Sequence, residues 1–145
     1  MKQTSLTLIA ACAAALGTAH PAMAQEAETE GGIALELNTL ADNGNGCLMT
    51  FVVESSLDAS IDKAAYEVVL FDGEGLVERM TVLDFQDVPA GRTRVRQFNI
   101  GDTTCEDVSR VLVNDVSACE GEGVADGACI EQLAVSSQSD VEFSN

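Results

Sequence analysis

The chain has 145 residues, of which 24 are acidic and seven are basic, so its formal net charge is −17 at neutral pH. A chain of this length typically folds as one domain with one modest core. The strong negative charge disfavours nucleic acid and anionic membrane surfaces as partners, and leaves neutral, cationic or metal-ion partners.

The first 24 residues have the features of a secretory signal peptide. Lys2 supplies a positive charge, residues 6–16 are apolar, and residues 22–24 (Ala-Met-Ala) form a small-residue cleavage site. We therefore expect cleavage after Ala24, with a mature chain that starts at Gln25. The apolar segment is too short to span a bilayer, so no transmembrane segment is expected.

A competing lipoprotein cleavage site ends at Cys12. It lies so close to Met1 that no full apolar segment precedes it, which favours the cut after Ala24. Either route exports the chain, and we expect a periplasmic or secreted protein.

Four cysteines remain after removal of residues 1–24: Cys47, Cys105, Cys119 and Cys129. An even number of cysteines in an exported chain indicates two disulfides, for which three pairings exist. The spacing favours Cys119–Cys129 as a local clasp around a Gly-rich loop, and Cys47–Cys105 as a bond between distant segments. In the chain-entropy model the longer loop stabilises more, by about 4 kcal/mol against about 3 kcal/mol.

The segment 25–32 is acidic and lacks apolar side chains, so it is expected to form a flexible arm. Residues 33–40 alternate apolar and polar side chains, which predicts a half-buried strand. A turn over residues 42–46 follows, and then a second strand over residues 47–54. The polar segment 55–62 is interpreted as a short helical turn.

Residues 66–100 contain three β-rich runs separated by two turn signals. The runs cover residues 66–71, 76–83 and 93–100, and the turns are Asp-Gly-Glu-Gly and Val-Pro-Ala-Gly. Because short turns connect them, the three strands are predicted to pair with one another in antiparallel order.

The C-terminal third is expected to contribute the last strands. Residues 108–115 and 130–136 have strand character, and residues 139–143 extend the latter or form an eighth strand. Residues 116–127 are rich in glycine and acids, which predicts an irregular loop. We therefore expect residues 33–145 to form an antiparallel, immunoglobulin-like β-sandwich of about seven or eight strands.

Three stretches carry a resemblance to known modules: residues 51–56, residues 69–77, and residues 88–91 followed by Phe98. They resemble the FxLYD-type bacterial modules, although Ser55 stands where asparagine is common. With the cysteine-bearing tail, the chain also resembles a family of small exported alphaproteobacterial proteins. The resemblance implies an immunoglobulin-like sandwich outside the cytoplasm, and it brings no activity with it.

Catalytic chemistry is poorly supplied in the expected mature chain. The single histidine, His20, belongs to the signal peptide, so Ser-His-Asp catalysis, Cys-His catalysis and imidazole metal sites are excluded after cleavage. Disulfide formation would remove the thiolate nucleophiles. We expect a non-enzymatic protein without a cofactor; a hydrolase that relies on carboxylates has no motif behind it.

Arg92, Arg94 and Arg96 are three of the seven bases and are spaced by two residues. On a strand this spacing places all three on one face, where they could bind a carboxylate, sulfate or phosphate group. The competing and preferred interpretation is that they neutralise acids on neighbouring strands. The acids considered for this role are Glu67, Asp72 and Glu78.

Acidic turns suggest calcium binding as a second possibility. None of them matches an EF-hand loop, so ordinary turn chemistry is the preferred interpretation. The best metal candidate is the loop that the Cys119–Cys129 disulfide would clasp, with Glu120, Glu122 and Asp126 as ligands.

The sequence thus favours a non-catalytic exported binding or structural module. Its expected partner is another envelope protein or surface component, and its working surfaces are the arginine-bearing strand and the loop 120–128. The alternative is weak binding of calcium or a cationic ligand through the acidic loops.

Overall fold

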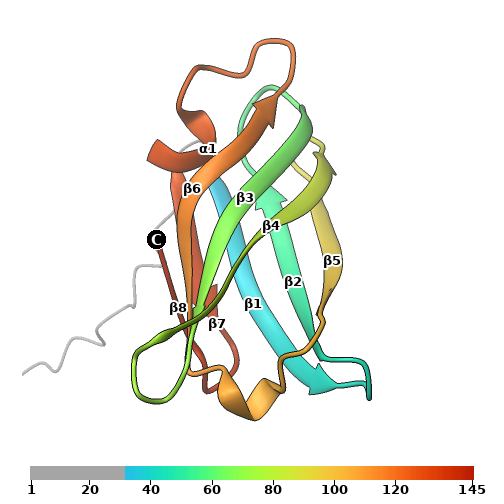
Figure 1. The fold of residues 1–145 in the computed structure, drawn as a ribbon. Coiled ribbons are helices and arrows are strands. Elements are labelled where there is room, and N and C mark those ends of the chain that lie inside the picture. Colours follow the sequence, from blue (N-terminus) through green and yellow to red (C-terminus); the bar gives the residue numbers. More distant parts are fainter. Residues whose placement is uncertain (1–31) are drawn as a thin grey trace, which may run out of the picture.

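The computed structural model describes residues 32–145, which form a β-sandwich of two four-stranded sheets (Figure 1). The strands are β1 (Ile33–Asp42), β2 (Cys47–Ser55), β3 (Ile61–Phe71), β4 (Val77–Val88), β5 (Thr93–Ile100), β6 (Arg110–Glu120), β7 (Leu133–Ser137) and β8 (Glu142–Ser144). A 3-10 helix, η1 (Cys105–Asp107), precedes β6, and one helical turn, α1 (Ala128–Glu131), follows it.

The expected signal peptide and residues 25–31 of the expected arm lie outside the described residues. Gly32, the last residue of that arm, is buried, and its backbone N–H donates to the Ser56 hydroxyl at 2.9 Å. Gly32 is therefore packed against the sandwich, and the expected flexible arm was wrong for this residue.

The two sheets have the strand orders β5-β2-β1-β7 and β4-β3-β6-β8. Most neighbours are antiparallel, but β7 runs parallel to β1 and β8 runs parallel to β6. These two pairings depart from the antiparallel arrangement that the turn pattern predicts. They are possible because the partners in each pair are not consecutive in the chain: five strands lie between β1 and β7, and α1 and β7 lie between β6 and β8.

Only one of the two turns in residues 66–100 closes a hairpin. Strands β3 and β4 pair as expected, whereas β5 pairs with β2 in the opposite sheet. At the corner between β4 and β5, Pro89 has no N–H to donate, and the Gly91 N–H donates to the Ser55 carbonyl at 2.8 Å. The corner thus carries the chain from one sheet to the other.

The core fills the space between the sheets. In β1 the alternation predicted from sequence is confirmed, because Ile33, Leu35 and Leu37 are all buried. The Phe51 ring lies at the centre and meets the rings of Phe85, Phe98 and Phe143 edge-on, with centroids 5.5–5.9 Å apart. Edge-on aromatic contacts of this kind add to the burial of apolar area.

Both expected disulfides are present. Cys47–Cys105 joins the start of β2 to η1, with Cα atoms 4.8 Å apart. Cys119–Cys129 joins the end of β6 to α1, with Cα atoms 6.0 Å apart. The pairing that the spacing favoured is therefore confirmed.

Three expected segments differ from the structure. The segment 55–62 is not a helical turn: residues 57–59 form bends between β2 and β3, and the Ser55 hydroxyl accepts the Leu57 N–H at 3.3 Å. Strand β6 continues through residues 116–120, which pair with β3 across two register shifts. These β-bulges disturb the alternation that would have revealed the strand. Residues 130–132 belong to α1 and its end, so β7 begins only at Leu133.

Candidate binding surfaces

The arginines of β5 face the interior at one open side of the sandwich. Arg94 and Arg96 lie opposite Val53 and Phe51 of β2, both of which are buried, so they share the face that lines the core. From there their guanidinium groups reach toward β4 of the other sheet.

Arg96 is the better anchored of the two. Its Nε donates to the Phe85 carbonyl at 2.7 Å, and its Nη2 donates to the Asp87 carbonyl at 3.1 Å and to Asp87 Oδ1 at 3.0 Å. Arg94 reaches the other Asp87 carboxylate oxygen at 3.4 Å. These two arginines therefore bridge the edges of the two sheets.

Arg92 does not join them. It lies in the turn before β5 and is exposed; its backbone N–H donates to the Pro89 carbonyl at 3.2 Å, but its side chain makes no hydrogen bond or ion pair with the rest of residues 32–145. The structure thus does not place the three arginines in one anion-binding face.

Arg94 and Arg96 pair with an acid on a neighbouring strand, as the preferred interpretation expected. The expected acids were wrong, because the partner is Asp87 and not Glu67, Asp72 or Glu78. The reason is that β5 lies across from the last residues of β4, in the opposite sheet from β3.

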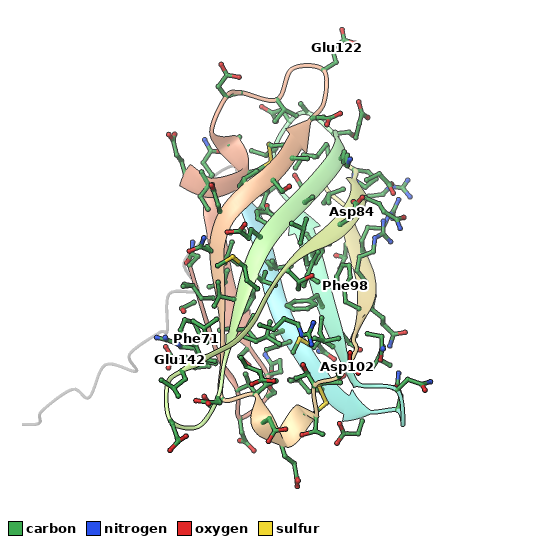
Figure 2. All side chains as sticks on the ribbon, in the orientation of Figure 1. Phe71, Asp84, Phe98, Asp102, Glu122 and Glu142 are labelled. Carbon is green, nitrogen blue, oxygen red and sulfur yellow. A yellow bond between two sulfur atoms is a disulfide. The ribbon has the colours of Figure 1, made fainter. Side chains whose placement is uncertain are left out.

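The clasped loop holds its three acids apart from one another. Glu120, Glu122 and Asp126 are exposed, and Glu122 projects from the tip of the loop (Figure 2). Within the part of the chain that the structure describes, no group of three His, Cys, Asp or Glu residues is placed to hold a metal ion. A cleft of about 320 Å³ lies between this loop and residues 57–59, lined largely by small apolar side chains.

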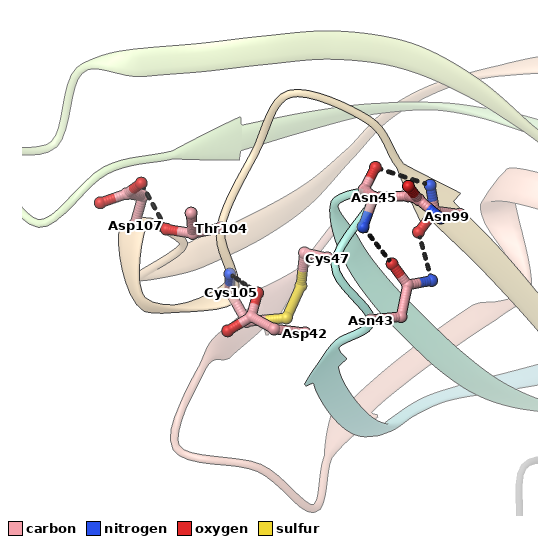
Figure 3. The surroundings of a disulfide bond; sticks show 8 residues. All are labelled: Asp42, Asn43, Asn45, Cys47, Asn99, Thr104, Cys105 and Asp107. Carbon is pink, nitrogen blue, oxygen red and sulfur yellow. Dashed lines mark hydrogen bonds between the residues drawn. A yellow bond between two sulfur atoms is a disulfide. The ribbon is translucent and has the colours of Figure 1, made fainter.

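Turn residues at the opposite end use their oxygens to hold the turn (Figure 3). Asp42 Oδ1 accepts the Cys105 N–H at 2.9 Å, next to the first disulfide. Asn43 Oδ1 accepts the Asn45 N–H at 3.0 Å, and Asn43 Nδ2 donates to Asn99 Oδ1 at 2.7 Å. These bonds are the turn chemistry that the sequence suggested for residues 42–46.

Tyr66 is a buried polar side chain inside the core. Its hydroxyl donates to the Cys129 carbonyl at 3.0 Å, which fixes α1 against β3. Burial raises the pKa of the Tyr66 phenol well above its usual range, because the phenolate would lose its hydration. Tyr66 is therefore a neutral structural group at ordinary pH.

Sequence reasoning missed an apolar surface on the outer face of the sheet β4-β3-β6-β8. Val77 is 59% exposed, Met80 55% and Val82 49%, all on the edge strand β4. In the register they lie beside Phe71, Val69 and Glu67 of β3. The available signal was that Val82 and Leu83 are adjacent apolar residues of one strand. Because successive side chains point to opposite faces, only one of the two can face the core.

No helix among residues 32–145 is long and apolar enough to cross a membrane. Comparisons of the chain with protein-family models, with curated proteins and with solved structures find no match.

Proposed function

We propose that this chain is an exported, non-catalytic binding module of the cell envelope, whose partner is another envelope protein. Export is supported by the signal-peptide pattern of residues 1–24 and by two disulfides, which form and persist in oxidising compartments.

We also propose that the sandwich is immunoglobulin-like. The strand order β4-β3-β6 matches the C′-C-F order of immunoglobulin variable domains, and β5-β2-β1 matches their E-B-A order. The parallel strands β7 and β8 are additions at the far edges. Small sandwich domains of this kind serve many cell-surface proteins as binding modules, which is an argument by analogy.

The observation that carries the proposal is the exposure of Val77, Met80 and Val82 on one edge strand. Scattered apolar side chains are normal on a surface, whereas a group of neighbours on one face marks an interaction site. In contrast, Arg94 and Arg96 are occupied by Asp87. We therefore propose the outer face of the sheet β4-β3-β6-β8, rather than the arginines, as the working surface of the module.

Site-specific photo-crosslinking tests the proposal. A photoreactive amino acid is introduced in turn at Met80, Val95 and Glu122, which lie on three different surfaces, and the full chain is expressed in the cells that export it. We expect a discrete crosslink to one envelope protein, identified by mass spectrometry, from at least one position. Absence of any crosslink at all three positions, or retention of the chain in the cytoplasm, would overturn the proposal.

A further inference from the structure

We propose that β4 accepts an added strand: an extended partner segment with alternating apolar side chains and a basic residue beside them pairs with residues 77–83. This inference rests on the proposed function and specifies where and how the partner binds.

The outer face of the sheet is built from rows that end abruptly at β4. One row runs Met80, Val69 and Leu112, and its neighbour runs Val77, Phe71 and Arg110. Val69, which has strands on both sides, is 3% exposed, whereas Met80 at the end of the same row is 55% exposed. A further strand beside β4 would continue these rows and cover their ends.

The backbone of β4 is open along the same stretch. Arg96 occupies the Phe85 and Asp87 carbonyls, which closes the last part of this edge. Residues 77–83 pair with β3 on one side only, and no other described residue bonds their outward backbone groups. Edge strands are usually protected by proline, bulges or charges. Residues 77–79 include Glu78, Arg79 and a register shift against β3, whereas residues 80–83 (Met-Thr-Val-Leu) carry none of these and form the unprotected part of the edge.

The acidic side chains around this surface favour a basic partner segment. Asp84 lies on the outer face next to Val82, and Glu67 and Asp115 lie further along that face. Figure 2 shows Asp84 toward one end of β4, with Phe71 and Glu142 toward the other end of the sheet. The bases on this face are Lys63, which lies opposite Glu120 in the register, and Arg110, whose guanidinium carbon lies 3.9 Å from the centre of the Phe71 ring. Asp84, Glu67 and Asp115 accept hydrogen bonds from neighbouring N–H groups but form no salt bridge within residues 32–145, so a basic side chain on the added strand would supply an ion-pair partner.

A second copy of this chain is a poor occupant. Residues 32–145 contain 21 acids and six bases, so two copies of this net-negative chain would repel each other when their β4 edges approach. In strand addition the main-chain hydrogen bonds supply affinity and alternate side chains supply specificity. The partner segment is thus expected to place apolar residues beside Met80 and Val82, and a lysine or arginine two positions away, beside Asp84.

A synthetic peptide tests this mode directly. The probe alternates threonine and valine and has lysine at both ends, and its control has glutamate in place of both lysines. We expect the purified chain to bind the lysine probe at low ionic strength and to bind the glutamate probe at least about tenfold more weakly. Hydrogen exchange of the backbone amides in residues 77–83 should slow when the lysine probe is bound.

The matched variants are Val82→Lys and Val95→Lys. Val95 is 58% exposed on β5 of the other sheet, so both changes place one lysine at a half-exposed valine. Val82→Lys should weaken binding about tenfold or more because it puts a like charge against the probe, and Val95→Lys should leave binding unchanged. Equal loss in both variants, no binding of the lysine probe, or protection of amides elsewhere would overturn the proposal.

Two further outcomes separate this inference from the function on which it rests. Crosslinking from Val95 or Glu122 but not from Met80 would retain an envelope partner and reject β4 as its site. Sedimentation that shows a dimer abolished by Val82→Lys would reject the basic partner segment in favour of a second copy.

Discussion

Arg96 reaches from one sheet to the other and satisfies two carbonyl groups that an edge strand would otherwise leave to water. Its planar group donates to the Phe85 and Asp87 carbonyls and to the Asp87 carboxylate, and 19% of its side chain is exposed. A lysine cannot reproduce this set of bonds, because a single ammonium lacks the fork geometry. Beneath the bridge, the Phe85 and Phe98 rings lie with centroids 4.9 Å apart.

We expect Arg96→Ala to lower the free energy of unfolding by about 1.5–3 kcal/mol, because it removes three hydrogen bonds of a charged group, one of them to the partly buried Phe85 carbonyl. Arg92→Ala, the control, removes a neighbouring base without a described partner and should change stability by less than about 0.5 kcal/mol. Urea denaturation followed by circular dichroism measures both. Equal effects in the two variants would show that net charge, rather than the bridge, matters.

Tyr66 links stability to pH on the alkaline side. Its pKa is raised in the folded state by burial, so above about pH 10 the unfolded chain releases the phenol proton while the folded chain keeps it. The stabilising effect is complete below that pH. Above it, the free energy of unfolding should fall by about 1.4 kcal/mol per pH unit.

Tyr66→Phe should lose about 1 kcal/mol at neutral pH, since the Cys129 carbonyl loses its partner, and should lack this alkaline decline. Urea denaturation between about pH 9 and pH 11 compares the two chains. Tyr66 is the only tyrosine and the chain has no tryptophan, so phenolate absorbance reports this residue alone. A parallel decline in both chains would assign the pH effect to other groups.

The residues of the candidate sites were predictable to different degrees. The disulfide partners followed from the number and spacing of the cysteines. The partner of Arg96 did not, because Asp87 becomes its neighbour only when the corner after Val88 carries β5 into the opposite sheet. The exposure of Met80 and Val82 also depends on which strand lies at an edge, and local alternation does not determine strand order.

At the scale of elements, the β1–β2 hairpin depends on close backbone approach at Gly46. This residue has φ +138°, and a Cβ atom added to it would lie 2.1 Å from the Ile100 carbonyl oxygen. Gly44 in the same turn has φ +81° but open space around it. A side chain at Gly46 would therefore suffer both backbone strain and a steric collision, whereas one at Gly44 would suffer backbone strain alone.

Gly46→Ala should destabilise the fold by about 2–4 kcal/mol, because the backbone of β5 must move away from β2. Gly44→Ala should cost about 1 kcal/mol, the usual penalty for a left-handed backbone with a side chain. Thermal unfolding by circular dichroism compares the two. A Gly44→Ala effect as large as that of Gly46→Ala would contradict the predicted collision.

The two disulfides close loops of very different length, with sequence separations of 58 and 10 residues. Replacing Cys47 and Cys105 together by alanine should cost about 4 kcal/mol, and replacing Cys119 and Cys129 together about 3 kcal/mol, because the longer loop restricts the unfolded chain more. Urea denaturation under oxidising conditions measures both double variants. The reverse order would indicate that native packing at α1, rather than loop closure, dominates.

Among the elements, regular strands with clear alternation were predicted well and interrupted ones poorly. Residues 33–40 and 47–54 lie within β1 and β2, where every second side chain is buried along all of β2 and along the first half of β1, up to Leu37. Strand β6 was cut short, because bulges place Asp115 and Val116 out of step with the pattern before them. The parallel edges were not predicted, since they pair strands that are not consecutive in the chain, and the sequence pattern does not specify which distant strands become neighbours.

At the scale of the whole molecule, charge opposes compactness. Residues 32–145 carry 21 acids against six bases, and the folded state holds these charges closer together than the unfolded state does. Dissolved salt screens such repulsion over distances of about 10 Å at 0.1 M. The stability of the sandwich should therefore depend on ionic strength.

We expect added NaCl to raise the melting temperature, and CaCl2 to raise it no more than MgCl2 at equal ionic strength. Screening raises the melting temperature equally for both divalent salts, whereas a calcium-specific site would raise it further in CaCl2 alone. Thermal scans at matched ionic strength provide the comparison. A midpoint rise specific to calcium, lost in Glu122→Gln combined with Asp126→Asn, would favour the calcium alternative.

The two parallel strands have a consequence for the order in which the domain is completed. Strands β7 and β8 come late in the chain, and each supplies the last member of a different sheet. A polypeptide threaded through a translocation channel from its N-terminal end would deliver β1 to β6 first, leaving both sheets one member short. On the export route that we propose, both sheets would therefore gain their last strand only after this C-terminal stretch has emerged.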